Sequence, residues 1–135
     1  VAISGDTVAV GARNDDDQSD RYSDSSGSAY IFTCDVAGSL TAGWTQLAKL
    51  LASDSAAGDS FGASVAISGD TVAVGARNDD DQSDRYSDSS GSAYIFTCDV
   101  AGSLTAGWTQ LAKLLASDSA AGDSFGASVA ISGDT

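Results

Sequence analysis

Histidine, glutamate and methionine are all missing from this chain of 135 residues. Without histidine or glutamate, the cysteines and the many serines have no evident base that could activate them as nucleophiles. Paired aspartates could act as acid and base, but adjacent carboxylates on a flexible loop are more often solvated. We therefore expect a protein that is not an enzyme. Because methionine is missing, Val1 is not a translation start, and we expect a processed product or a part of a longer chain.

Basic residues, cysteines and long apolar runs are scarce. Six lysines and arginines stand against 19 acidic residues, and the net charge of −13 speaks against nucleic acid or an anionic membrane as a partner. No run approaches the roughly 20 apolar residues that a membrane span needs. Cys34 and Cys98 form neither the dense pattern of a disulfide scaffold nor a paired set of metal ligands.

What the chain does contain is aspartate and a strict repeat. Every acidic residue is aspartate, which favours turns and loops where glutamate favours helices, and this predicts a loop-rich β protein. Residues 1–64 form a first repeat, residues 65–128 reproduce it letter for letter, and residues 129–135 begin a third copy. Such identity indicates recent duplication or deliberate construction, and a designed symmetric repeat protein is one interpretation. A unit of this size cannot close a core alone, so we expect neighbouring copies to supply the missing contacts.

Four segments of each repeat have the character of short strands. Residues 59–76 predict a tight β-hairpin, because two runs rich in β-branched residues flank Ser68-Gly69-Asp70. Ser28–Cys34 alternates between two faces and is the clearest strand. Trp44–Ala52 fits a helix as well as a strand, and we favour a strand because nine residues are short for a helix and the unit needs a fourth strand. The pattern predicts an all-β fold in which each repeat forms one β-propeller blade of four antiparallel strands.

Four short sequence words, always in the same order, carry a family resemblance. They are Phe61-Gly62, Gly75-Ala76, the sequence Gly-Ser-Ala-Tyr-Ile-Phe at residues 91–96 and the sequence Trp-Thr-Gln-Leu-Ala-Lys-Leu at residues 108–114. In these words the chain resembles the FG-GAP repeats of integrin-alpha-like β-propellers, and the bacterial and algal extracellular variety is the most similar. The resemblance implies one four-stranded blade per repeat, usually several blades in a ring, in secreted or cell-surface proteins that serve adhesion or scaffolding.

Two departures from the family pattern bear on function. Arg13 and Arg77 replace the proline of the Gly-Ala-Pro word, which removes a rigid backbone angle but need not disturb the blade. Integrin-type repeats carry a calcium-binding motif between the first and second strands, where this chain has only Ser-Gly-Asp-Thr at residues 68–71. That calcium site cannot be carried over to this chain.

An aspartate-rich loop in each repeat is the candidate metal site. Calcium binds about six to eight oxygen ligands, and several carboxylates close together in one loop could supply them. The candidate ligands are Asp15, Asp17 and Asp20 in the first repeat and Asp79, Asp81 and Asp84 in the second. The alternative interpretation is a solvated acidic loop that is kept polar by its own repulsion.

Tryptophans and cysteines are the remaining candidates for a functional role. Trp44 and Trp108 either form stacking platforms for sugars, as in propeller lectins, or fill the packing layer between blades, and we favour packing. Cys34 and Cys98 are not expected to bond to each other, because equivalent positions of adjacent blades lie beyond the Cα separation of about 7 Å that a disulfide allows. A bridge from either cysteine to another chain and a thiol are the two alternatives.

Together these features favour a non-catalytic, extracellular structural or adhesive propeller module. A carbohydrate- or ligand-binding propeller, similar to a lectin, is the alternative. The expected partners are further copies of the repeat, in the same chain or in other chains, with an extracellular protein or glycan as a further candidate. Because two blades leave sheet faces uncovered, we do not expect a stable monomer. We expect a part of a longer array, with a closed ring of about three or four chains as the alternative.

Overall fold

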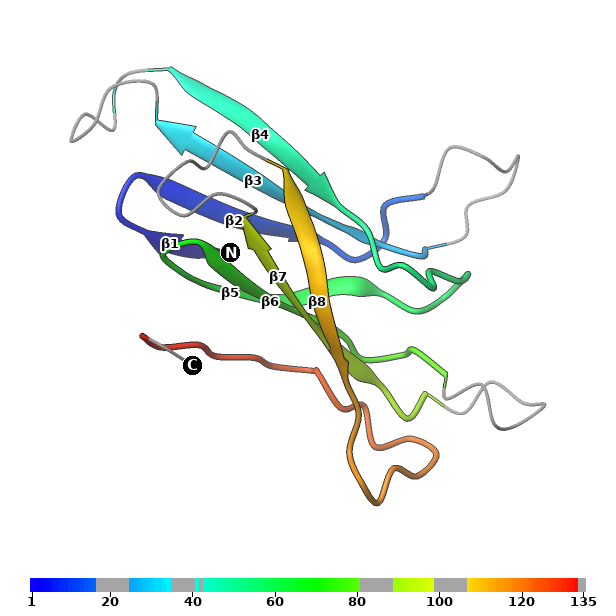
Figure 1. The fold of residues 1–135 in the computed structure, drawn as a ribbon. Coiled ribbons are helices and arrows are strands. Elements are labelled where there is room, and N and C mark those ends of the chain that lie inside the picture. The colour runs from blue at the N-terminus through cyan, green and yellow to red at the C-terminus, as the bar shows by residue number, and fades with distance from the viewer. Residues whose placement is uncertain (17–24, 35–40, 42, 81–88, 99–106, 134–135) are drawn as a thin grey trace.

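The protein consists of β-strands and the loops that join them. The structure is a computed structural model, and it describes residues 1–16, 25–34, 41, 43–80, 89–98 and 107–133. In these residues every regular element is a strand, and all strands belong to two four-stranded antiparallel sheets (Figure 1). The predicted all-β fold with four strands per repeat is confirmed. The described part of the chain contains no helix that could cross a membrane.

Each sheet is a meander in which strands that follow one another in the chain are also neighbours in the sheet. The strands of the first sheet are β1 (Ala2–Ser4), β2 (Thr7–Ala12), β3 (Ser28–Cys34) and β4 (Trp44–Leu50). Those of the second sheet are β5 (Phe61–Ser68), β6 (Thr71–Ala76), β7 (Ser92–Cys98) and β8 (Trp108–Leu114). This order is that of a propeller blade, and the two sheets do not close into a ring. The boundary between the first and second sequence repeats falls inside β5.

The ambiguous fourth segment is a strand, and a β-bulge explains its mixed pattern. Ile31 of β3 pairs with Ala48 of β4, whereas the next residue, Phe32, pairs with Gln46. Leu47 is therefore an extra residue on β4, which is the geometry of a bulge. Because the extra residue shifts the alternation by one position, the leucines of this strand also fit the spacing of a helix. The same bulge occurs in the second sheet.

Each sheet has two faces, and we name them after one residue of the third strand. The Ile face carries Ala9, Ala29, Ile31 and Leu50 in the first sheet and the equivalent residues Ala73, Ala93, Ile95 and Leu114 in the second. The Tyr face carries Val8, Val10, Tyr30 and Phe32 in the first sheet and Val72, Val74, Tyr94 and Phe96 in the second. The two sets alternate along the strands because successive side chains of a strand point to opposite faces.

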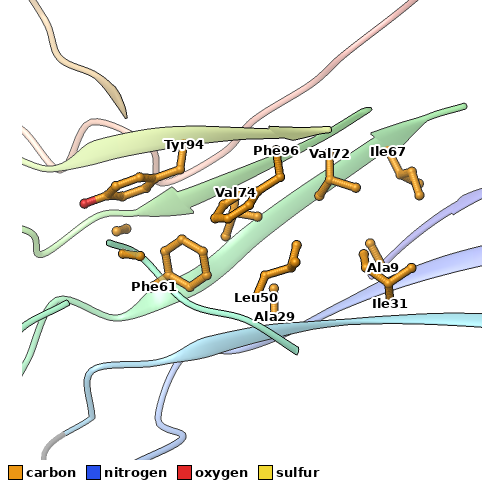
Figure 2. Close-up of a cluster of buried hydrophobic side chains, with 12 residues drawn as sticks. Ala9, Ala29, Ile31, Leu50, Phe61, Ile67, Val72, Val74, Tyr94 and Phe96 are labelled. Atoms are coloured by element: carbon orange, nitrogen blue, oxygen red, sulfur yellow. The ribbon is translucent and has the colours of Figure 1, made fainter. Parts of the chain in front are cut away.

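The core lies where the Ile face of the first sheet packs against the Tyr face of the second (Figure 2). Phe61 and Ile67 of β5 are part of the same cluster. Because the two repeats are identical, the difference in burial between equivalent residues comes from the neighbouring sheet. Leu50 is 3% exposed, whereas Leu114, at the equivalent position on the Ile face of the second sheet, is 44% exposed. Tyr94 is fully buried, and its equivalent Tyr30 is only partly buried.

Candidate functional site: the joint between the sheets

The backbone of β5 lies directly against the backbone of the first sheet. The N–H of Phe61 donates a hydrogen bond to the carbonyl oxygen of Ser26 at 2.9 Å, and the N–H of Ser60 donates one to the carbonyl oxygen of Ser25 at 3.2 Å. Gly27 and Phe61 form an isolated parallel bridge. The second sheet therefore begins by hydrogen bonding to the first, and we call this contact the joint.

Three glycines allow the two backbones to come this close. Gly62 has a φ of 87°, and a Cβ added to it would clash with the carbonyl oxygen of Ser28. A Cβ on Gly11 would clash with the carbonyl oxygen of Gly62, and one on Gly27 would clash with that of Phe61. Any side chain at these positions would push the sheets apart, because the atoms that it meets belong to backbone that cannot rotate away.

The same joint occurs a second time, between the second sheet and the beginning of the third copy. The N–H of Phe125 donates to the carbonyl oxygen of Ser90 at 2.9 Å. A Cβ on Gly126 would clash with the carbonyl oxygen of Ser92, as at the first joint. The hydroxyl of Ser64 also donates to the carbonyl oxygen of Gly126 at 2.8 Å. The joint is thus a property of the repeat and not of one place in the chain.

Aromatic side chains fill the space beside the first joint. The ring centroid of Phe61 lies 5.3 Å from that of Tyr94 and 6.0 Å from that of Phe96, both in edge-to-face geometry. Such pairs contribute about 0.5–1.5 kcal/mol beyond the burial of their area. Figure 2 shows Phe61 pointing toward the side chains of Tyr94 and Val74. The phenylalanine thus anchors the joint in the core.

A polar cluster lies at the edge of this core and connects the two repeats. The ammonium group of Lys113, on β8, lies 2.6 Å from a carboxylate oxygen of Asp79 and 2.6 Å from one of Asp54. Tyr94 donates its hydroxyl to Asp54 at 2.8 Å, and Ser92 donates to Asp79 at 2.6 Å. Asp54 follows β4 in the first sheet, whereas the other residues belong to the second. We call these residues the polar key.

The charges of the polar key stabilise one another. Burial opposes the charge of Lys113, but its hydrogen bonds to Asp54 and Asp79 outweigh this effect and raise its pKa. Burial would likewise raise the pKa of Asp54, and the bonds from Lys113 and Tyr94 lower it below its usual value. Burial raises the pKa of the Tyr94 hydroxyl, which therefore stays protonated and donates. The key holds one cation between two anions from different sheets.

The first sheet carries the same key without the aspartate from a preceding repeat. The ammonium group of Lys49 lies 2.7 Å from Asp15, and Asp15 accepts hydrogen bonds from Ser28 at 2.6 Å and from Tyr30 at 2.8 Å. The hydrogen bonds from Lys49, Ser28 and Tyr30 lower the pKa of Asp15 to about 2. The lysine, the tyrosine and their acidic partner are thus in place on the Tyr face of the first sheet, on which no other sheet of the described residues packs.

Comparison with known protein families assigns the repeat to one of them. The sequence matches the family model of the FG-GAP repeat over residues 1–32, 44–96 and 108–135. The chain belongs to the FG-GAP repeat family. No curated protein and no solved structure matches the chain. The family that the sequence words predict is confirmed, while a closed ring of several blades stays a prediction.

The FG-GAP words have a physical explanation in the joint. The Phe-Gly word of one repeat, Phe61-Gly62, contacts the Gly-Ala word, Gly11-Ala12, of the sheet before it. Phenylalanine supplies the anchor in the core, and the glycines remove the Cβ atoms that would keep the backbones apart. In this chain the two words therefore mark the place where one sheet is fastened to the next.

The structure places only two of the six predicted metal ligands. Asp15 and Asp79 bind Lys49 and Lys113, so each contributes its carboxylate to an ion pair. The other four candidates lie outside the described residues: Asp17, Asp20, Asp81 and Asp84. Among the residues that are described, no group of three or more acidic or cysteine side chains could hold a metal ion. The calcium site stays a prediction.

The tryptophans and cysteines occupy the end of each sheet where the third and fourth strands pair. Trp44, on the outermost strand of the first sheet, is 39% exposed, whereas its equivalent Trp108 is partly buried and packs against the core. The expected packing role thus fits Trp108 better than Trp44. Cys34 and Cys98 are both buried, and they pair across the strands with Trp44 and Trp108. A disulfide to another chain stays a prediction.

Neither the lysine nor the tyrosine of the polar key is among the candidate site residues that the sequence predicts. A signal was present, because each repeat has a single lysine, and it lies between an alanine and a leucine near the end of its strand segment. In the sheet this lysine is the cross-strand partner of the tyrosine, as Lys113 is of Tyr94. The role of Asp54 could not be found in this way, since it depends on contact with residues of the next repeat.

Asp59, directly before the Ser60 and Phe61 of the joint, is a buried acid like Asp79 of the polar key. The residue is 4% exposed, and its carboxylate accepts the N–H of Ala56 at 2.7 Å. Burial raises the pKa of Asp59 to about 7. The hydrogen bond from Ala56 opposes this shift, and the nearby charges of Asp79 and Asp80 add to it. The carboxyl group is therefore protonated more easily in the folded chain than in the unfolded chain.

The raised pKa of Asp59 should make stability depend on pH. The unfolded chain loses this proton near its ordinary pKa of 3.8 and the folded chain only near pH 7, so stability falls as the pH rises through this window. Asp59→Asn cannot ionise and can still accept the N–H of Ala56. We expect this variant to be more stable than the unmodified chain at about pH 8, by up to a few kcal/mol, since one pKa unit corresponds to about 1.4 kcal/mol. Urea unfolding at several pH values measures this difference.

Asp123→Asn is the matched control for this experiment. Asp123 has the same position in the second repeat and accepts the N–H of Ala120 at 2.9 Å, but it is exposed. Because its carboxylate is exposed, we expect Asp123→Asn to change the free energy of unfolding at alkaline pH much less than Asp59→Asn does. Equal effects of the two variants would show that the Asp59 carboxyl group is not buried.

Proposed function

We propose that this FG-GAP chain is a structural repeat module of an extracellular or cell-surface protein, with adhesion or scaffolding as its role. FG-GAP repeats typically occur in such proteins and are generally non-catalytic. The observation that carries the proposal is the joint, which occurs once between the sheets and again at the start of the third copy. A unit that fastens each copy to the next by its backbone is suited to building an extended surface.

In this proposal the sheets join one repeat to the next, and the remaining surface is available to other partners. The residues with the greatest burial all serve contacts between strands or between sheets. The net charge of −13 keeps such a surface soluble and disfavours anionic partners. The proposed partners are further copies of the repeat and an extracellular protein. Calcium bound by the aspartate-rich loops would fit this setting, but the proposal does not depend on it.

A glycan-binding module is the second candidate, and the exposure of Trp44 favours it. This tryptophan lies at the start of β4, the outermost strand of its sheet, with 39% of its surface exposed. Exposed aromatic rings at an edge can stack on the apolar faces of sugars. Trp108 has the same place in the second sheet but contacts the core. A lectin would use such a position once in each repeat.

Binding of the whole chain to a broad panel of glycans separates the two functions. The structural module predicts no saturable binding to any glycan of the panel. The lectin predicts saturable binding that is lost in Trp44→Ala and Trp108→Ala, while Trp44→Phe retains part of it because the ring can still stack. Saturable binding with this pattern of loss would overturn the structural proposal.

A further inference from the structure

The Ile face of the second sheet forms an apolar hollow on the surface of the chain. The hollow has a volume of about 560 Å³, and its lining includes Ala73, Ile95 and Leu114 from the sheet and Ile131 from the third copy. Leu111, which also lines it, is 63% exposed. Patches of this kind on a monomer usually mark a surface that binds another protein.

The first sheet shows what covers such a face. Its own Ile face has the same residues, and the Tyr face of the second sheet buries Ile31 and Leu50 there almost completely. On the matching Tyr face of the first sheet, Tyr30 and Phe32 are only partly buried, and no second sheet of the described residues covers them. One chain therefore displays both halves of a contact whose complete form is present between its two sheets.

The polar key is divided between the same two surfaces. Asp118 has the position after β8 that Asp54 has after β4, and it is exposed. Within the described residues Asp118 takes part in no ion pair. On the other surface, Lys49 and Tyr30 lie beside Asp15 just as Lys113 and Tyr94 lie beside Asp79. The acid and its two partners thus lie on opposite faces of the chain.

We propose that a second copy of this chain docks the Tyr face of its first sheet onto the Ile face of the second sheet, with Asp118 of one copy bound to Lys49 and Tyr30 of the other. The contact deepens the proposed function, on which it rests, by naming the surface and the residues that join copies. It uses two different surfaces, so it is heterologous and repeats from copy to copy. Apolar burial supplies the affinity, and the polar key fixes the register of the two sheets.

One strand position is contested at this contact. Residues 1–5 belong to the copy that contributes its first sheet, and residues 129–133 belong to the copy that contributes its second sheet. The two segments have the same sequence, and only one of them can pair with β2 of the first sheet. The resident strand β1 has three residues, and Ile3 on it is 68% exposed. The equivalent strand β5 has eight residues and includes the Phe61 anchor. The segment of the other copy that includes residues 129–133 follows its own anchor, Phe125, as the rest of β5 follows Phe61. If it pairs with β2 as β5 pairs with β6, it makes more contacts than β1 does.

Asp118→Asn tests the contact in the full chain. Sedimentation equilibrium of the unmodified chain should show association that depends on concentration. The variant should raise the dissociation constant about tenfold or more, because its amide removes the carboxylate that would join Asp15 in binding Lys49 of the other copy. The direction in which the dissociation constant changes is diagnostic, since the variant also removes one negative charge from a chain of net charge −13. General repulsion between acidic chains would instead predict tighter association.

Asp54→Asn is the matched control, because it makes the same change within the complete key. It should lower the midpoint of urea unfolding and leave the dissociation constant within about twofold of that of the unmodified chain. Asp118→Asn should do the opposite. Tyr30→Phe removes the hydroxyl that Asp118 would contact, so the double variant Asp118→Asn with Tyr30→Phe should show less than the sum of the two single effects.

Three results would overturn the docking contact. They are a chain that stays monomeric at every concentration, equal dissociation constants for Asp118→Asn and the unmodified chain, and additive effects of Asp118→Asn and Tyr30→Phe. Each of them leaves the proposed structural function standing, because that function fails instead through saturable glycan binding. The two proposals can therefore fail separately.

Discussion

Replacing Phe61 by alanine is expected to lower the free energy of unfolding by about 3–5 kcal/mol, the range for loss of a buried phenylalanine. The side chain is fully buried between the sheets, and its ring packs edge to face on Tyr94 and Phe96. Its removal would leave a cavity at the place where the second sheet is fastened to the first. Urea unfolding followed by aromatic fluorescence and by far-ultraviolet circular dichroism measures the loss.

Phe125→Ala provides the comparison, because Phe125 has the same place in the next repeat. Its backbone makes the equivalent hydrogen bond to Ser90, but its side chain is only partly buried. We expect a clearly smaller loss of stability for Phe125→Ala than for Phe61→Ala. Equal losses in the two variants would mean that the neighbouring sheet does not bury Phe61, and the joint would have to be abandoned.

Replacing Gly62 by alanine is expected to be almost as damaging. The φ of Gly62 is 87°, a conformation that costs an L-residue about 1–2 kcal/mol. The new Cβ would also meet the carbonyl oxygen of Ser28, and overpacking of this kind adds about 1–3 kcal/mol. Together these terms predict a loss of about 2–5 kcal/mol in the free energy of unfolding, again measured with urea.

Gly58→Ala separates the two terms. Gly58 has nearly the same φ, 92°, but no described atom outside Gly58 and its two chain neighbours lies within 4 Å of the position that its Cβ would take. This variant should therefore lose only the part of the stability that depends on φ. A loss as large in Gly58→Ala as in Gly62→Ala would show that the close approach of the two backbones contributes nothing to the effect.

Local sequence features were sufficient to predict the strands. The Ser68-Gly69-Asp70 turn and the alternation in Ser28–Cys34 are signals within single segments, and the structure has strands at both places. Even the ambiguous segment beginning at Trp44 could be assigned, because a fourth strand was needed to complete the sheet. The β-bulge at Leu47 could not be predicted, since it depends on the register with β3.

The polar key and the joint were harder to find for a physical reason. Asp54 contacts Lys113 across 59 positions of the chain, and the contact forms only when the two sheets are packed together. Exact repetition adds to the difficulty, because Asp54 and Asp118 are identical in sequence and differ only in what lies beside them. Only the sheet reveals that Asp15 and Asp79 lie beside a lysine.

Nuclear Overhauser contacts of the Phe61 ring test the central claim most directly. That claim is that the Tyr face of the second sheet packs on the first sheet through the Phe-Gly joint. The phenylalanine signals can be assigned with the variants Phe61→Leu and Phe125→Leu, which distinguish the repeats. The account predicts contacts from the Phe61 ring to the rings of Tyr94 and Phe96, at the centroid separations of 5.3 and 6.0 Å. A Phe61 ring without contacts to either residue would contradict it.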